Sequence, residues 1–428
     1  MVLSLSGTKM AHASGIRSIM EDIATSMRGA STGSLLNLSI GNPAPIPEVV
    51  GTWRRLFDET LDASFARASC LYGPSRGTDD LVAAIVEYFS GRYGWPLTPE
   101  HVVVGSGSQM LSFVASAVFT GPGAARDTKT VLPALPDYTG YQGVYLFPGG
   151  VAGIAPRIEL CGDRRFRYHL DPDALRRSDD IGLLLLSSPS NPTGRCVSPQ
   201  ELDALLEIAA DRDVPIFFDH AYGAPFPQIV ETPEPPRWHE NIINVFTVSK
   251  AGLPGERIGF AVGDPRFIEP MVSFVANSTL HAGQLAQQVT ARALATGELD
   301  RLTAEVIRPY YAHKRRLGEA AGGHPAGRRE LAAARRHVRR HVLLGMGGRA
   351  VVRRPRPLRP REGEGRVPGA RPALLHRGGR PGRLRPPRRP LLPDQPQRRR
   401  AGAHRGPGTH RRRPRRAARR GVSAGSAA

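Results

Sequence analysis

Residues 247–257 read Thr247-Val248-Ser249-Lys250-Ala251-Gly252-Leu253-Pro254-Gly255-Glu256-Arg257. The apolar run Ile242–Phe246 precedes this stretch and is typical of a buried strand. Lys250 is therefore expected just beyond a strand end, with hydroxyl side chains beside it and Arg257 seven residues further on. Burial or a neighbouring cation lowers the pKa of such a lysine, which can then form a Schiff base with a carbonyl group. A surface lysine after a strand would show the same local pattern, so the rest of the chain has to decide between the two.

The positive charge of the chain is concentrated in its C-terminal part. The 428 residues carry a formal net charge of +21, but residues 321–428 contain 31 Arg and only 4 Asp or Glu. Residues 1–320 hold 28 basic and 34 acidic residues, which is a net charge of −6. The first 320 residues therefore have the composition of a mildly acidic globular protein, and any nucleic-acid binding would fall to the basic tail.

The sequence favours a cytoplasmic protein that does not bind a membrane or a metal. Glu21, Asp22 and Arg28 lie where a secretory signal would be apolar. The chain has no run of eighteen apolar residues, so no transmembrane helix is expected. Neither a CxxC pair nor an even disulfide set can be made from the three cysteines, which are Cys70, Cys161 and Cys196.

Strand-like and helix-like segments alternate through the body of the chain. Apolar runs predict buried strands at His101–Val104, Thr130–Pro133, Ile181–Ser187, Val214–Asp219, Ile242–Val248 and Arg257–Val262. Helical patterns are found at 14–30, 78–92, Pro199–Arg212 and Pro265–Asn277. This alternation predicts an α/β fold with a mainly parallel sheet covered by helices on both faces.

Several polar residues are expected at one edge of this sheet. Ligands of such folds bind at the carboxyl ends of the strands, and Ser108, Asn191, Asp219 and Lys250 each end or follow a predicted strand. The turn Gly105–Gln109 also joins a strand to a helix, a geometry that directs backbone N–H groups and the positive end of the helix dipole at an anion. One such turn is a weak signal, whereas the convergence of these residues predicts a binding site.

Each requirement of a pyridoxal phosphate (PLP) site has a candidate residue. In PLP enzymes the cofactor supplies the carbonyl group that the lysine binds, and its ring acts as an electron sink. Asp219 could keep the pyridine nitrogen protonated, although a turn or capping role is the alternative. Asn191 and Tyr222 could donate hydrogen bonds to the phenolic oxygen, and Tyr138 could stack on the ring.

The candidate phosphate ligands come from two parts of the chain. A guanidinium group and backbone or hydroxyl donors suit phosphate oxygens. The candidates are Gly107, Ser108, Gln109, Thr247, Ser249 and Arg257.

The motifs resemble those of a known family. Fold-type I aminotransferases related to aspartate aminotransferase are similar in Asn191-Pro192-Thr193-Gly194, Asp219-x-x-Tyr222 and Ser249-Lys250-x-Gly-Leu-Pro-Gly-x-Arg257. The valine–pyruvate type within that family is similar in Gly41-Asn42-Pro43, Gly107-Ser108-Gln109, Pro136-x-Tyr138-x-Gly140-Tyr141 and Ala221-Tyr222-Gly223-x-Pro225-Phe226-Pro227. The resemblance covers Leu36 to Arg316.

The resemblance implies a reaction and an assembly. It assigns to the candidate residues the same roles as above, with Lys250, Asp219 and Tyr222 as catalytic residues. Lys250 would bind PLP and, once released, move the proton of the substrate Cα. Tyr72 would reach the cofactor phosphate of a neighbouring subunit, which implies a homodimer. The amino group of an aliphatic amino acid such as valine or alanine would pass to PLP and then to a 2-oxo acid such as pyruvate.

The C-terminal part departs from the family pattern. We expect an N-terminal arm at 1–40, a PLP-binding large domain at 41–300 and, at 301–320, a helix that Pro309 kinks on its way to a small domain. That small domain, which carries the arginine for the substrate carboxylate, is predicted to be missing or disrupted. Residues 321–428 lack aromatic residues and isoleucine and cannot easily bury a core. We interpret them as a disordered segment or as an out-of-frame translation of a GC-rich gene.

Two alternatives stay open at this point. A PLP-dependent lyase or cyclase of a specialised pathway could use the same fold, because the chemistry of these enzymes diverges only after the substrate has bound. A non-catalytic protein could instead use the basic tail to bind nucleic acid by neutralising phosphates.

Overall fold

The computed structural model describes residues 2–11, 15–28, 41–123, 126–161, 165–230 and 234–323. Residues 29–40 of the expected N-terminal arm lie outside this set. So do residues 324–428, and with them our interpretation of the tail. Within the described ranges, no helix is long and apolar enough to cross a membrane.

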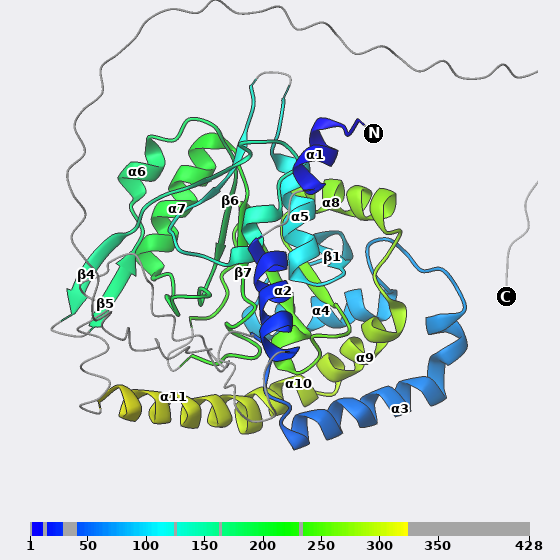
Figure 1. Ribbon diagram of the computed structural model, residues 1–428. Coiled ribbons are helices and arrows are strands. Elements are labelled where there is room, and N and C mark those ends of the chain that lie inside the picture. Colours follow the sequence, from blue (N-terminus) through cyan, green and yellow to red (C-terminus); the bar gives the residue numbers. More distant parts are fainter. Residues whose placement is uncertain are drawn as a thin grey trace, which may run out of the picture. The chain divides into compact units, whose positions relative to one another are not determined.

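A seven-stranded sheet forms the centre of the fold (Figure 1). Its order is β1-β9-β8-β7-β6-β2-β3, with neighbours parallel from β3 to β8, whereas β9 runs antiparallel to both β1 and β8. The strands are β1 (Val102–Gly105), β2 (Lys129–Leu132), β3 (Val151–Gly153), β6 (Ile181–Ser187), β7 (Ile216–Asp219), β8 (Ile242–Thr247) and β9 (Gly259–Val262). The predicted mainly parallel sheet is confirmed. A separate antiparallel hairpin pairs β4 (Arg157–Cys161) with β5 (Arg165–His169).

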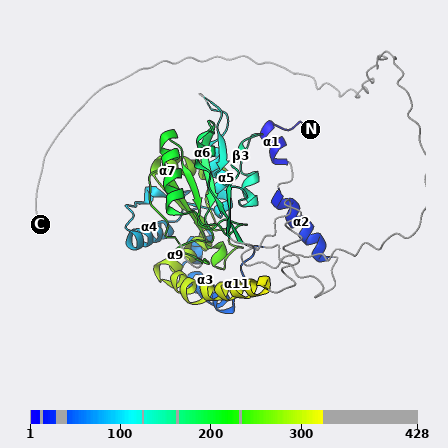
Figure 2. The ribbon, with the colours of Figure 1, turned by 90° about the vertical axis from the view of Figure 1, so that its left-hand side faces the viewer.

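Helices cover both faces of the sheet (Figures 1 and 2). One face packs against α5 (Ser108–Phe119) and α8 (Pro265–Ser278). The other face packs against α6 (Pro172–Arg176) and α7 (Pro199–Arg212) and, around β8 and β9, against α3 (Pro47–Ser69), α4 (Asp79–Tyr93) and α9 (Gln284–Ala295). The N-terminal helices are α1 (Leu5–Ala11) and α2 (Gly15–Arg28), and the short helices are η1 (Pro99–His101), η2 (Thr139–Gly143) and η3 (Val248–Ala251).

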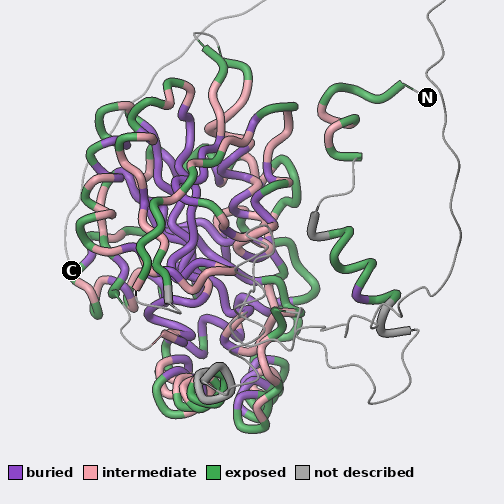
Figure 3. Tube along the Cα trace, turned by 60° about the vertical axis from the view of Figure 1, so that its left-hand side comes forward, coloured by how far each residue is buried: buried purple, intermediate pink, exposed green. Residues whose placement is uncertain are grey.

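Alternation along the strands decides which helix each side chain meets. Leu183 and Leu185 of β6 pack with α5 and α8, whereas Leu184 and Leu186 pack with α7. All four are fully buried, all residues of β1, β6, β7, β8 and β9 are buried, and the tube in Figure 3 is buried through the middle of the fold. Because successive strand residues point to opposite faces, a continuous apolar run is what a sheet covered on both faces requires.

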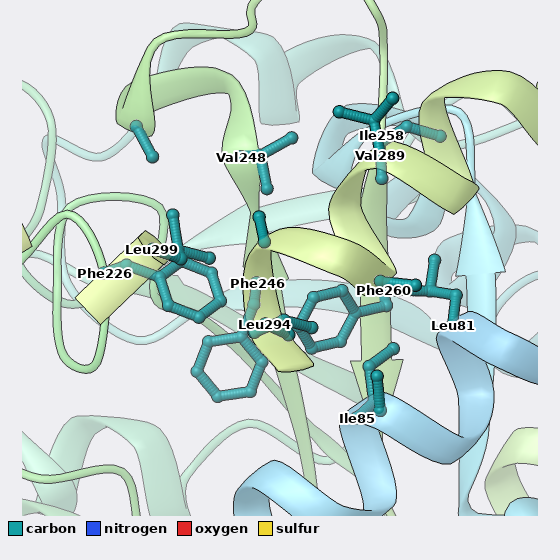
Figure 4. Packing of buried hydrophobic residues seen from close by; sticks show 14 of the residues in the cluster. Leu81, Ile85, Phe226, Phe246, Val248, Ile258, Phe260, Val289, Leu294 and Leu299 are labelled. Carbon is teal, nitrogen blue, oxygen red and sulfur yellow. The ribbon is translucent and has the colours of Figure 1, made fainter. Parts of the chain in front are cut away.

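A cluster of buried hydrophobic side chains packs β8 and β9 against helices from distant parts of the chain (Figure 4). Phe246 of β8 and Phe260 of β9 belong to this cluster, together with Leu81 of α4 and Leu294 of α9. The ring centroids of Phe246 and Phe260 are 5.5 Å apart. Burying each of these side chains contributes about 1.5–3 kcal/mol, so this cluster fixes the two strands whose connection carries Lys250.

The helix predicted at 301–320 is built in three parts. It consists of α10 (Glu298–Arg301), the wider π-helical turn η4 (Leu302–Ile307) and α11 (Arg308–Gly323). Proline has no N–H to continue the α-helical pattern, and such irregular turns are common where the pattern is interrupted. The disturbance expected at Pro309 therefore takes the form of a π-helical turn just before it.

Candidate active site

The carboxyl ends of three neighbouring strands place polar side chains on one face of the sheet. Ser187 ends β6, Asp219 ends β7 and Thr247 ends β8, and Ser187 is the direct register partner of Asp219. Each of these three residues lies two positions beyond a strand residue that packs with α5 and α8. Those strand residues are Leu185, Phe217 and Val245. The three side chains therefore face the α5 side of the sheet.

Asp219 is a buried carboxylate without an ion pair among the described residues. Its side chain accepts hydrogen bonds from Tyr141 Oη at 3.0 Å and from the backbone N–H of Ala221 at 2.9 Å. Burial raises the pKa of Asp219 to about 6, although the two hydrogen bonds and the charge of Lys250 act in the opposite direction. A cationic N–H donor placed against this carboxylate would relieve the penalty of burial.

Lys250 lies in the short helix η3 directly after β8. Its Nζ donates a hydrogen bond to the carbonyl oxygen of Gly41 at 2.6 Å and lies 5.4 Å from the centroid of the Tyr222 ring. Burial lowers the pKa of Lys250; Arg257 acts in the same direction and Asp219 in the opposite one. The surroundings therefore shift the equilibrium of this amine toward its neutral, nucleophilic form.

The connection from β8 to β9 brings Thr247, Ser249 and Arg257 together. Thr247 Oγ1 lies 2.9 Å from Ser249 Oγ, and Arg257 Nη1 donates to Ser249 Oγ at 3.3 Å. Gly107, at the start of α5, has a positive φ of 85°, and a Cβ there would lie 2.5 Å from Arg257 Nη2. A glycine at this position therefore lets the guanidinium approach the turn closely.

The N-terminus of α5 faces the same group of donors. A Cβ at Gly259 of β9 would lie 2.8 Å from the backbone N of Ser108, so α5 begins in direct contact with the sheet. The first N–H groups of a helix have no partner within the helix and carry the positive end of its dipole. Together with the hydroxyl groups and Arg257, they form a cup that suits a phosphate group.

The turn at η2 supplies the aromatic side of the site. The Tyr138 and Tyr141 rings meet edge to face, with centroids 5.3 Å apart. Burial raises the pKa of Tyr138, as does the charge of Asp219, while Arg257 opposes them. The pKa of Tyr138 therefore depends both on the Asp219 carboxylate and on Arg257 of the cup. Gln109 Nε2 donates to the carbonyl oxygen of Gly140 at 3.1 Å, so this side chain is directed at the tyrosine turn.

Tyr222 and Asn191 join the same group. Tyr222 is buried, and its pKa is raised by burial and by the neighbouring Tyr138 and Asp219, whereas a hydrogen bond with Asn191 lowers it. A small cavity next to Lys250 is lined by Gly41, Asn42, Pro43, Tyr222, Ile229 and Tyr311. Tyr311 comes from α11, and its hydroxyl group accepts a hydrogen bond from the N–H of Ala44 at 2.9 Å.

Tyr72 is not brought to the other candidates. It lies in the loop 70–78 between α3 and α4, is 88% exposed, and meets the His281 ring edge to face at 6.2 Å. Conversely, two residues of the site were not predicted as such. Tyr141 belongs to a quoted motif but was given no role, and Ser187 could have been found from its position at a strand end.

Comparison with known proteins identifies the family. The family model for class I and II aminotransferases matches residues 34–317. The chain belongs to the class I and II aminotransferases.

Among curated relatives, this aminotransferase is 31% identical to the valine–pyruvate aminotransferase of Escherichia coli K12, over 73% of this chain and 74% of that protein. Two solved structures are also similar. A putative amino-acid aminotransferase from Psychrobacter arcticum matches with a TM-score of 0.69 and 28% identity, covering 74% of this chain and 77% of that one. The valine–pyruvate aminotransferase of Salmonella typhimurium LT2 matches with a TM-score of 0.63 and 29% identity, covering 72% and 75%.

Proposed function

We propose that this aminotransferase binds PLP at the strand ends and transfers an amino group from an aliphatic amino acid to a 2-oxo acid of the pyruvate type. One observation carries the proposal. The Asp219 carboxylate and the Lys250 amine are both withdrawn from water at the carboxyl ends of adjacent parallel strands, and the charge of each alters the pKa of the other.

The residues present fit the shape and charge of PLP. Asp219 has no ion-paired partner among the described residues and a raised pKa, which suits contact with a protonated ring nitrogen. The cup formed by the α5 N-terminus, Thr247, Ser249 and Arg257 has the donors that a phosphate group requires. The charges of Asp219 and Arg257 both alter the pKa of Tyr138, so this side chain is close enough to both for its aromatic face to stack on the cofactor ring.

The chain would use its own groups to hold and move protons around the cofactor. PLP supplies an aldehyde that condenses with amines and a protonated ring that withdraws electrons. Asp219 would keep the ring nitrogen protonated, and Asn191 and Tyr222 would donate to the phenolic oxygen. Lys250 would hold the aldehyde in the resting enzyme, and its lowered pKa suits it to accept and return the substrate Cα proton afterwards.

The walls around Lys250 support a substrate with a small apolar side chain. The side chains of Pro43, Ile229 and Tyr311 line the cavity beside the amine. Ile229 is buried and Tyr311 is half-buried, so a charged substrate side chain would find no counter-charge among these three. The similarity to valine–pyruvate aminotransferase supports the same class of donor and acceptor.

The test is a PLP titration of the purified full chain, followed by incubation with valine and pyruvate. Wild type should develop the visible absorbance of a bound aldehyde, which valine removes, and should form alanine. Lys250→Ala should lose both, whereas Lys314→Ala, which changes an exposed lysine of α11, should lose neither. Release of ammonia without alanine would indicate a lyase instead, and failure of wild type to bind PLP would refute the proposal.

We also propose that the enzyme is a homodimer. Tyr72 is too exposed to serve the site of its own chain, and exposed apolar side chains lie near it or near its neighbour His281 in the sequence. Phe65, Leu71 and Leu280 are 52%, 65% and 45% exposed. A partner subunit would cover them and receive Tyr72 at its cofactor phosphate. The cytoplasmic location stays a prediction.

A further inference from the structure

A second buried carboxylate, Asp137, lies beneath the candidate site. It is 9% exposed and precedes Tyr138 in the turn after β2. Its Oδ1 accepts hydrogen bonds from the N–H of Tyr138 at 2.7 Å, from Ser187 Oγ and from Ser190 Oγ at 3.4 Å, and its Oδ2 accepts the N–H of Ser187 at 3.2 Å. Asp137 therefore connects the tyrosine turn with the end of β6 and with the segment that carries Asn191.

In all four contacts the Asp137 carboxyl group accepts a hydrogen bond, which suits its ionised form. Four donors point at the two oxygens, and a protonated carboxyl would direct a hydrogen of its own at one of them. Burial raises the pKa of Asp137, while the hydrogen bonds and the charge of Arg195 oppose that rise. The Arg195 side chain is itself buried, and its Nη1 and Nη2 have no hydrogen-bond partner among the described residues. Its nearest carboxylate oxygen in an ion pair is Glu201 Oε2, at 4.0 Å. Arg195 thus offers Asp137 a buried counter-charge without taking any of its lone pairs.

We propose that Asp137 is a positioning residue, which holds the Tyr138 turn against the end of β6 and the Ser190–Asn191 segment. The stacking face of Tyr138 and the donor of Asn191 are then placed relative to each other before the cofactor arrives. This inference rests on the proposed function for the roles of Tyr138 and Asn191. Asp137 itself would touch neither PLP nor substrate.

A purely structural role for Asp137 predicts a different result. In that case Asp137→Asn would lower stability but would not change what Tyr138 and Asn191 contribute to cofactor binding. A positioning role makes the effect of Asp137→Asn depend on the presence of those two side chains, because nothing is left to position once they are removed. The two roles can therefore be separated by a double-mutant comparison.

The first experiment measures PLP affinity of the full chain by absorbance titration. Asp137→Asn should weaken binding about tenfold in wild type, the effect of a buried group that loses its partners. The same change should have little effect in a Tyr138→Leu/Asn191→Ala background. Asp203→Asn, which changes an exposed carboxylate paired with Arg237, should leave the affinity unchanged. An equal loss in both backgrounds, or no loss in wild type, would overturn the inference.

The second experiment needs no cofactor. Hydrogen exchange of the apoprotein should become faster at the N–H groups of Tyr138 and Ser187 in Asp137→Asn, since both donate to this carboxylate. Ser187→Ala, which removes one donor and keeps the carboxylate, should cause a smaller change at Tyr138 and serves if Asp137→Asn does not fold. Unchanged exchange at Tyr138 in both variants would contradict the connection. If the variants show the expected exchange differences but wild type binds no PLP, the proposed function is refuted. Only the structural connection between the Tyr138 turn and the end of β6 then stands.

Discussion

At the scale of single residues, Asp219 is a buried carboxylate whose pKa is raised by the fold. Its carboxylate is 4% exposed, and its two hydrogen bonds do not prevent burial from raising its pKa from 3.8 to about 6. Between those values, the folded apoprotein holds a proton that the unfolded chain has released. The contribution of Asp219 to the free energy of unfolding therefore falls as the pH rises from about 4 to about 6.

Asp219→Asn should remove this pH dependence. The variant should gain stability relative to wild-type apoprotein, on the order of 2–3 kcal/mol between about pH 4 and about pH 7.5, because asparagine does not titrate. Urea unfolding of both apoproteins at the two pH values measures the difference. PLP affinity should fall in the same variant, which would separate the functional role of the carboxylate from its effect on stability. A constant difference in stability across this range would contradict the assignment.

Gly259→Ala should damage the phosphate cup without changing any of its donors. The added Cβ would meet the backbone N of Ser108 at 2.8 Å and the Phe246 carbonyl oxygen at 2.9 Å, so the start of α5 must move. Such overpacking costs about 1–3 kcal/mol, and PLP affinity should fall with it. Thermal unfolding and a PLP titration check the two effects. Gly255→Ala, where nothing lies within 4 Å of the added carbon, is the matched control and should behave as wild type.

The sequence predicts residues of the site well where a motif or a strand end marks them. Lys250, Asp219, Tyr222 and Asn191 are brought together as expected, although their roles toward PLP stay predictions. The sequence does not reveal that Asp137 joins the Tyr138 turn to the end of β6, because Asp137 and its partner Ser187 are fifty positions apart. The sequence likewise does not reveal that the Gln109 side chain is directed at the tyrosine turn, because its partner Gly140 is distant in the chain.

At the scale of elements, α7 shows how local signals set a helix boundary. Ser198 caps its N-terminus by accepting the N–H of Glu201 at 3.2 Å, and Glu201 accepts the N–H of Ser198 at 2.9 Å in return. Pro199 occupies the first turn, where its missing N–H is not needed. These signals explain why the predicted helix Pro199–Arg212 agrees with the structure.

Ser198→Ala should lower the free energy of unfolding by about 1 kcal/mol, because it removes the side-chain half of this capping box. Chemical denaturation of the apoprotein measures the loss. Gln200→Ala changes an exposed residue of the same turn that makes no cap, so it should change stability by less than about 0.5 kcal/mol. Equal losses in the two variants would show that the cap contributes nothing.

Other elements could not be predicted because tertiary contacts define them. The helices α3 and α9 pack around β8 and β9, and a single sequence does not show that segments so far apart share one cluster. The antiparallel direction of β9 is likewise invisible in its apolar pattern, which is the same for both directions. The strand also begins at Gly259 rather than at the predicted Arg257, because Arg257 adopts a positive φ of 53° and turns its guanidinium toward Ser249.

At the scale of the whole molecule, the proposed dimer gives a prediction about mass. Light scattering should find twice the mass of one chain for wild type, and Phe65→Glu should reduce it toward one chain by placing a charge at an exposed apolar position that the partner subunit would cover. PLP affinity should fall along with the mass, since Tyr72 would no longer reach a partner. Ile158→Glu, at an equally exposed apolar position on β4, should remain a dimer. A wild-type mass of one chain would reject the assembly.

The connection between β8 and β9 has a consequence for protein engineering. The two strands pair at Thr247 and Gly259, so both ends of the connection are anchored side by side. The amine of Lys250 and the guanidinium of Arg257 therefore belong to one short segment whose two ends are paired. A transplant of residues 247–259 into a related scaffold would carry the proposed cofactor-binding amine and the proposed phosphate ligand together, while the scaffold would have to supply the counterparts of Asp219, Tyr138 and Tyr222.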